Sequence, residues 1–177
     1  MTVRKIVIWP DNILEDEAVE VSSEEDISDL IDDMIDTMIA LNGVGIAAPQ
    51  VGVSKQIFVI DKGTDESLDD HLVMINPKIN DGFGDTVSIE GCLSFPGFEF
   101  HVPRAEILNV TFQDRNGEIQ ELNASGFLSI AIQHEMDHLT GDLLDRTVNR
   151  QQRRGMRKTL SKFKKRLEAK NERRHAS

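Results

Sequence analysis

The chain has 177 residues, of which 39% are hydrophobic and 29% charged, so it suits one compact domain and is neither collagen-like nor wholly disordered. No apolar run approaches the ~20 residues that span a bilayer, and the N-terminus is unlike a signal peptide. Cys92 is the single cysteine, which excludes an internal disulfide and favours a reducing compartment. We therefore expect a cytoplasmic protein that does not contact a membrane.

The formal net charge of -11 averages two opposite regions. Residues 146–177 contain 13 Lys and Arg against two acids, a net charge of +11. Residues 1–145 contain 7 basic and 29 acidic residues, a net charge of -22. Such a basic tail is attracted to phosphate-rich surfaces, whereas the acidic body is repelled from them. The alternative is a solvated helix that packs on its own acidic body.

The first predicted elements are a helix and a set of short strands. Apolar residues recur at helical spacing from Ile27 to Ile39, which predicts a helix over about 26–41. Runs rich in β-formers predict strands at 56–61 and 72–76. An Asn-Gly turn joins 105–113 to 118–123 in a predicted hairpin.

Two further helices complete the pattern. The first is predicted from Phe127 to about Thr140, with Ser125 as its cap and Gly141 at its end, and the second over about 149–172. The order indicates an α+β fold over a single domain, 1–177. In it, an N-terminal helix and antiparallel strands accompany a buried second helix, and 146–177 forms a basic C-terminal helix.

The second helix carries the strongest chemical signal, His134-Glu135-Met-Asp-His138. Residues four apart lie on one helix face, so both imidazoles can bind one metal ion. Glu135, beside them, can act as a general base toward water. Because the helix is apolar on nearly all sides, we expect it to be buried. Two hydrogen-bonded core histidines are the alternative interpretation.

A catalytic site of this kind generally needs a third protein ligand. The metzincin pattern fails because Leu144 occupies the next ligand position, and no Glu lies between Glu135 and Glu168 for a thermolysin-like site. The third ligand must therefore lie upstream. Cys92, in Glu90-Gly-Cys-Leu-Ser94, is the candidate, although a lone cysteine is more often a buried packing residue.

A third segment, Gly43-Val-Gly-Ile-Ala-Ala-Pro-Gln50, contains no P-loop lysine. Taken alone it predicts a turn after the first helix. Its small residues would also let a backbone approach a ligand closely, and Gln50 offers an amide donor.

Together these segments resemble peptide deformylase, whose signatures are Gly-x-Gly-x-Ala-Ala-x-Gln, Glu-Gly-Cys-Leu-Ser and His-Glu-x-x-His-x-x-Gly. All three occur here in order, and the similarity spans roughly residues 3–165. It implies an α+β fold with antiparallel strands around the motif helix. The implied activity is metal-dependent hydrolysis of the N-formyl group from the initiator formylmethionine of nascent polypeptides, which releases formate.

The resemblance also assigns roles to residues. It implies that Cys92, His134 and His138 bind the metal and that Glu135 is catalytic. Gln50 and the Leu93 amide would contact the reacting carbonyl, and Gly45 would pair with the substrate backbone. For the methionine side chain that the resemblance implies, we predict an apolar pocket formed by Ile46, Phe127 and Ile130, with ordinary core packing as the alternative.

The resemblance implies iron(II) in the cell, and zinc, nickel or cobalt can replace it in a purified sample. It also implies that the basic C-terminal helix binds the ribosome. We expect the protein to be a monomer. Deleting 150–177 should then weaken ribosome association and leave hydrolysis of a formyl-Met tripeptide nearly intact. Two other classes stay open here: a different metal hydrolase such as an endopeptidase, and a non-catalytic ribosome- or RNA-binding protein.

Overall fold

The computed structural model describes the backbone of residues 2–175 and the side-chain surroundings of residues 2–169. Its helices are α1 (Asn12–Glu15), α2 (Ser28–Ala40), α3 (Gly126–Thr140) and α4 (Arg150–His175). Its strands are β1 (Gly45–Ala47), β2 (Ile57–Ile60), β3 (Leu72–Phe83), β4 (Thr86–Gly91), β5 (Glu99–Arg104), β6 (Ile107–Gln113) and β7 (Ile119–Ser125). Short 3-10 turns follow at Ala48–Val51, Lys62–Thr64 and Leu144–Thr147.

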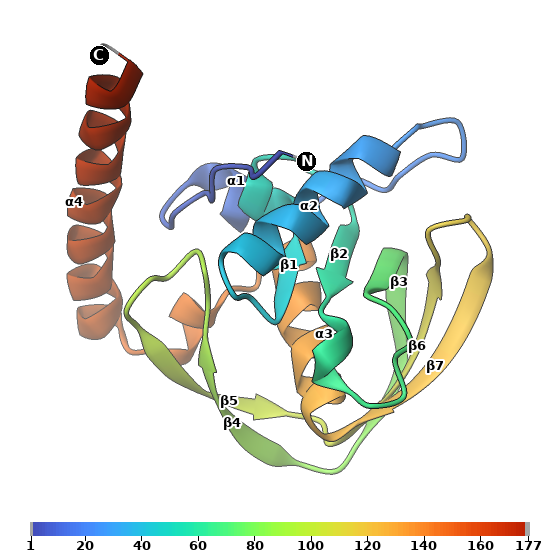
Figure 1. Ribbon diagram of the computed structural model, residues 1–177. Coiled ribbons are helices and arrows are strands. Elements are labelled where there is room, and N and C mark those ends of the chain that lie inside the picture. The colour runs from blue at the N-terminus through green and yellow to red at the C-terminus, as the bar shows by residue number, and fades with distance from the viewer. Residues whose placement is uncertain (1, 176–177) are drawn as a thin grey trace.

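All strand pairs within the two sheets are antiparallel. The larger sheet has the order β1-β2-β3-β6-β7, and β4 and β5 form a separate hairpin. Helix α3 lies near the centre of the molecule, with the larger sheet on one side and the hairpin below it (Figure 1). The α+β class predicted from the sequence, with a central motif-bearing helix, is confirmed.

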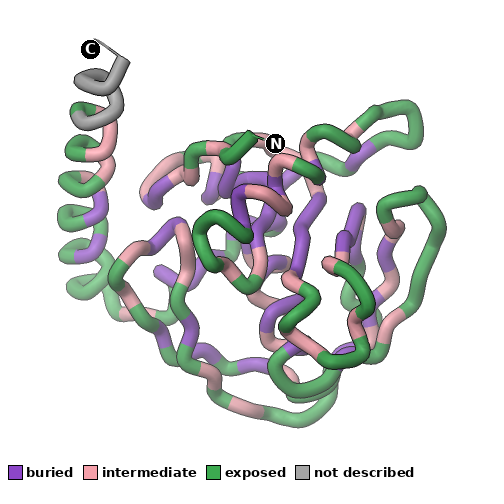
Figure 2. Tube along the Cα trace, viewed as in Figure 1, coloured by how far each residue is buried: buried purple, intermediate pink, exposed green. Residues whose placement is uncertain are grey.

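Strand β2 lies in the buried part of the larger sheet. Its four residues are all buried, because Ile57 and Val59 pack under α2 whereas Phe58 and Ile60 pack against α3. A strand covered on both faces is continuously apolar rather than alternating. Figure 2 shows this buried layer as purple segments that run through the sheet and α3.

The predicted helices are confirmed with small shifts at their ends. Ser125 precedes α3 as predicted, but its side chain makes no capping hydrogen bond. The strand predicted at 72–76 is longer and ends at Phe83, with an irregular register after Ile75 where Pro77 removes a backbone donor. The sequence predicted no bounds for strands β1, β4 and β5.

The first half of α4 belongs to the folded body. Met156 and Leu160 are buried in a cluster with Trp9 and Phe95, and Lys164 Nζ lies 2.6 Å from Asp11 Oδ2. A deletion of 150–177 would expose this apolar cluster. The expectation that hydrolysis of a formyl-Met tripeptide survives this deletion stays a prediction, and it requires the body to remain folded without these contacts.

Further along, α4 leads away from the body and carries the predicted basic tail (Figure 1). Residues 176 and 177 of that tail lie outside the described residues. Among the helices that the structure describes, none combines the length and the hydropathy of a membrane span.

Candidate functional site

Helix α3 places the two motif histidines side by side. It starts at Gly126 and is terminated by Gly141, whose backbone N–H bonds to the Asp137 carbonyl with a left-handed φ of 71°. One turn separates His134 from His138, and their ring centroids lie 5.3 Å apart. His138 is buried and His134 is nearly so. The sequence prediction of a buried helix with both imidazoles on one face is confirmed.

Cys92 comes to these histidines from a distant part of the chain. It follows β4 directly, and its Sγ lies 3.2 Å from Nε2 of His138. The candidate ligand atoms of Cys92, His134 and His138 all lie within 4.8 Å of one another. Three such atoms at this spacing can hold one cation and leave further coordination positions open.

A buried carboxylate orients the first histidine. Nδ1 of His134 lies 2.8 Å from Oε2 of Glu90 and donates to it, which leaves Nε2 with a free lone pair for a metal. Burial alone would raise the pKa of Glu90, but hydrogen bonds from Arg104, His134 and Ser88 outweigh it and hold the pKa at about 2. Glu90 is therefore a carboxylate at neutral pH.

Arg104 holds this carboxylate in place. Its Nε and Nη2 donate to the two oxygens of Glu90 at 2.7 and 2.8 Å, and its Nη1 donates to Asp137 Oδ2 at 2.7 Å. The network joins β4, β5 and α3 behind the histidines. Sequence reasoning assigned no role to Glu90, Arg104 or Asp137. The only available signal was the charge of Glu90 two residues before the candidate ligand.

Glu135 lies beside the group of three. Its side chain is buried, and Oε2 has no hydrogen-bond partner among the described residues. Burial raises the pKa of Glu135 to about 7. A neighbouring cation would favour its ionised form. His138 Nδ1 likewise has no partner among the residues described. The donor set of one cysteine sulfur and two imidazoles fits a borderline divalent metal.

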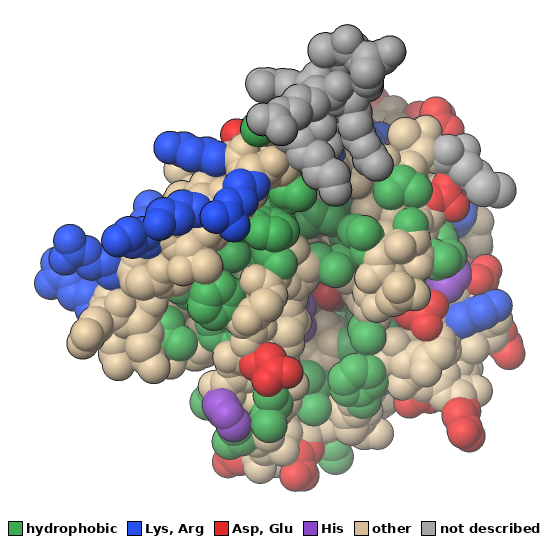
Figure 3. Space-filling model, turned by 60° about the vertical axis from the view of Figure 1, so that its left-hand side comes forward, with side chains coloured by type: hydrophobic (Ala, Val, Ile, Leu, Met, Phe, Trp, Pro, Cys, Tyr) green, Lys and Arg blue, Asp and Glu red, His purple; other side chains and the backbone are tan. Residues whose placement is uncertain are grey.

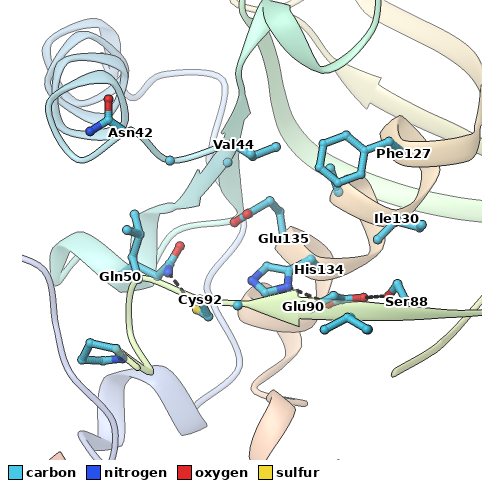
Figure 4. Close-up of a pocket in the computed structure, with 17 residues that line it drawn as sticks. Asn42, Val44, Gln50, Ser88, Glu90, Cys92, Phe127, Ile130, His134 and Glu135 are labelled. Atoms are coloured by element: carbon cyan, nitrogen blue, oxygen red, sulfur yellow. Dashed lines mark hydrogen bonds and ion pairs between the residues drawn. The ribbon is translucent and has the colours of Figure 1, made fainter. Parts of the chain in front are cut away.

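Gln50 is held with its amide directed toward this group (Figure 4). Its Oε1 accepts a hydrogen bond from the Ala47 N–H at 2.9 Å, so Nε2 must face the other way. Nε2 lies 3.3 Å from Ser94 Oγ and 3.4 Å from Cys92 Sγ. The side-chain amide is therefore fixed as a donor at the floor of the cleft.

The site opens into a cleft of about 570 Å³. One wall includes Val44 and Gly45, the first residue of β1, the other includes β4 and Leu93, and α3 forms the end of the cleft. In the described part of the chain, β1 pairs only with β2 and β4 only with β5. An extended peptide can therefore enter between two open strand edges.

Gly45 has a steric reason to be glycine. A Cβ atom at this position would lie 2.9 Å from Cδ of Glu135, closer than real side chains approach. The sequence led us to expect a close approach of this backbone to a ligand, and the structure shows that the backbone at Gly45 lies against Glu135.

The predicted side-chain pocket is partly corrected. Phe127 and Ile130 line the cleft, and Figure 4 shows them on α3 across from Val44. Ile46 does not, because it is fully buried in the core beneath α2. Val44 lines the cleft beside this segment instead.

Three candidate ligand atoms beside a buried carboxylate, at the floor of an open cleft, are typical of a metal-dependent hydrolase. The comparisons with known proteins identify the family. The sequence profile of the polypeptide deformylase family matches residues 3–154. The chain therefore belongs to the peptide deformylase family, hydrolases that remove the formyl group from N-formylmethionine peptides.

Individual relatives agree with this assignment. Peptide deformylase from Thermodesulfovibrio yellowstonii is 46% identical over 145 residues, which cover 81% of this chain and 88% of the relative. Peptide deformylase 1 from Bacillus subtilis is 41% identical over 151 residues, covering 85% and 92% of the two chains.

Solved structures show the same fold. A peptide deformylase from Legionella pneumophila superposes with a TM-score of 0.84 at 40% identity, covering 95% of this chain and 98% of the other. The enzyme from Ehrlichia chaffeensis in complex with actinonin gives a TM-score of 0.85 at 35% identity, with coverages of 92% and 98%. Neither the endopeptidase nor the non-catalytic binding protein considered from the sequence fits this family.

Proposed function

We propose that this chain removes the N-formyl group of nascent polypeptides at the cleft between β1 and β4, with Glu135 as the acid–base residue. The observation that carries the proposal is the buried Glu135 carboxylate. It has an oxygen without a partner among the described residues, and it lies next to three converging ligand atoms. An unpaired buried carboxylate is costly, so its retention is explained by a proton that it must accept and return.

Cys92, His134 and His138 would hold the metal. A divalent cation there supplies a Lewis acid that lowers the pKa of water toward ~7. We propose iron(II) as this metal in the cell. A thiolate with two imidazoles also suits zinc, nickel and cobalt, so the donor set by itself does not discriminate among them.

Glu135, Gln50 and Leu93 have separate roles in the proposed reaction. Glu135 accepts a proton from the attacking water at its unpartnered Oε2 and later returns it to the leaving nitrogen. Gln50 Nε2 and the Leu93 N–H donate to the formyl oxygen as it gains negative charge. One such donor is typically worth about 3 kcal/mol of transition-state stabilisation.

The cleft supports binding of an extended peptide. Its backbone would pair with Gly45, and the methionine side chain would enter the apolar end formed by Val44, Phe127 and Ile130. The small formyl group needs no acyl pocket, which agrees with the close approach of Gly45 to Glu135.

The deciding experiment is formate release from formyl-Met-Ala-Ser by the metal-loaded protein. Glu135→Gln should lower kcat by about 10²–10⁴-fold, the usual contribution of a general acid–base, at unchanged metal content. Glu121→Gln, on the exposed strand β7, is the matched control and should keep full activity. Full activity of Glu135→Gln would refute the assigned role, and no formate release by the wild-type protein would refute the function.

The proposed metal has its own test. Protein purified without oxygen should contain iron, lose activity in air, and keep activity in air when nickel or cobalt replaces the iron. Full activity of the iron form after prolonged aeration would contradict the iron assignment.

We further propose that α4 docks on the ribosome, in the cytoplasm, and that the enzyme is a monomer. Figure 3 shows Lys and Arg side chains gathered along one margin of the molecule, and four arginines between 150 and 157 share one exposed surface. Because α4 also supports the core, the test replaces exposed basic residues instead of deleting the helix. The triple variant Arg154→Gln, Lys158→Gln, Lys162→Gln should weaken ribosome binding and flatten its salt dependence, with hydrolysis of the tripeptide unchanged.

Equal ribosome binding by that variant would refute the docking proposal. Sedimentation at micromolar concentration should give the mass of one chain, and a dimer mass would refute the monomer.

A further inference from the structure

The N-terminal residues Val7–Trp9, which we call the strap, cross behind the site and touch both segments that supply the proposed oxyanion donors. The Val7 N–H donates to the Gln50 carbonyl at 2.8 Å. Two residues later, the Trp9 N–H donates to the Ser94 carbonyl at 3.1 Å. Gln50 and Ser94 are 44 positions apart in the chain, and the strap joins them through main-chain hydrogen bonds.

The side chain of Trp9 anchors the strap to the turn that carries Leu93. It is fully buried, and its ring stacks on Phe95 with centroids 5.4 Å apart. The Phe95 N–H in turn donates to the Cys92 carbonyl at 3.0 Å, which closes the turn around Leu93. A shift of the Trp9 ring therefore acts directly on the turn that presents the Leu93 N–H.

Two contacts from elsewhere fix the indole itself. Its Nε1 donates to Glu15 Oε1 at 3.1 Å, and the guanidinium of Arg157 lies over the ring, 5.0 Å from the centroid. Buried Leu160 of α4 belongs to the same apolar cluster. Trp9 thus connects the body of the protein to the segment that forms the floor of the cleft.

We propose that Trp9 is a positioning residue for the reaction, which holds the Gln50 amide and the Leu93 N–H at a fixed separation so that both reach one oxygen atom. This inference rests on the proposed function. Donors that are already in place stabilise developing charge without reorganisation, and a misplacement of about 1 Å can cost about 10²-fold in rate. The strap does not line the cleft that receives the substrate, so substrate affinity should depend little on it.

The test compares three variants at equal metal content and well below their unfolding temperatures. Trp9→Leu loses the stacking and the indole donor, and should lower kcat about tenfold with KM within about twofold of wild type. Trp9→Phe keeps an aromatic ring on Phe95 and should recover most of the loss. Leu160→Ala is the matched control from the same cluster: it should lower the unfolding temperature and leave kcat unchanged.

A second measurement does not depend on activity. In nitrogen-15 NMR spectra, the Leu93 amide and the Gln50 side-chain amide should shift or broaden in Trp9→Leu and stay in place in Leu160→Ala. If Trp9→Leu does not fold, Trp9→Met, which also loses the stacking and the indole donor, takes its place in both measurements. Unmoved signals in the variant without the ring, or equal effects in Leu160→Ala, would overturn the inference. Absence of formate release by the wild-type protein would instead refute the proposed function and leave the NMR comparison to decide the role of Trp9.

Discussion

Arg104 offers a direct test of the network behind the candidate ligands. Its guanidinium makes three hydrogen bonds of 2.7–2.8 Å, two to Glu90 and one to Asp137, and its side chain is 6% exposed. Replacing it by methionine keeps an apolar chain of similar length and leaves Glu90 as a buried carboxylate without its cation. Asp137 is 28% exposed and can recover part of its loss from water.

Removing one partner from a buried ion pair typically costs about 3–5 kcal/mol. For a domain of this size, each kcal/mol lowers the unfolding temperature by about 2–4 °C, so Arg104→Met should unfold about 6–20 °C below wild type. Urea unfolding followed by circular dichroism at pH 7 gives the free-energy difference. Metal affinity should also fall by about 10–100-fold, measured by competition with a chelator, because Glu90, which accepts the hydrogen bond of His134, is no longer held in place by Arg104.

Two controls separate the charge effect from loss of packing. Arg115→Met breaks the exposed pair with Asp32, whose side chains are 45% and 57% exposed, and should cost at most about 1 kcal/mol. In the double variant Arg104→Met, Glu90→Gln, the uncompensated charge is gone, so its cost should be smaller than the sum of the single costs. A loss below about 1 kcal/mol in Arg104→Met would refute this reasoning.

Three further outcomes follow from the structure. Gly45→Ala should lower kcat about 10²-fold, because the new Cβ atom must displace the Glu135 carboxylate, and should change the stability little. Formate release measures kcat, and thermal unfolding measures the stability. Gly141→Ala should lower the free energy of unfolding by about 1–3 kcal/mol, because φ is 71° and a Cβ atom would collide with the backbone of Glu15. A free energy of unfolding within about 0.5 kcal/mol of wild type, roughly the scatter of surface substitutions, would contradict this. The hydrogen bond from Lys164 lowers the pKa of Asp11 below its usual 3.8, so this carboxylate stabilises the fold above that pH and loses its contribution as the pH falls below it. The stability difference between wild type and Asp11→Asn should therefore shrink between pH 5 and pH 3 in urea unfolding, and a constant difference would count against it.

The sequence by itself predicted the features that depend on neighbours along the chain. The i, i+4 spacing of His134 and His138 places both on one face of any helix, whatever surrounds it. Apolar periodicity located α2 and α3, and the Asn-Gly turn located the hairpin of β6 and β7. The charge count located the basic helix α4. Cys92 was a candidate from the residues alone, and the family signatures raised it to a predicted ligand.

Tertiary structure alone decided which distant segments meet. Glu90 and Arg104 are 14 positions apart, Arg104 and Asp137 are 33 apart, and no local pattern connects them. Strand β1 has only three residues, so it is recognised as a strand only by its pairing with β2. In that pairing the side chain of Ile46 lies in the core and not in the cleft. The same holds for Met156 and Leu160, whose burial depends on where α4 lies. Periodicity specifies the faces of an element, but the surface that each face meets is fixed only when the whole chain is packed.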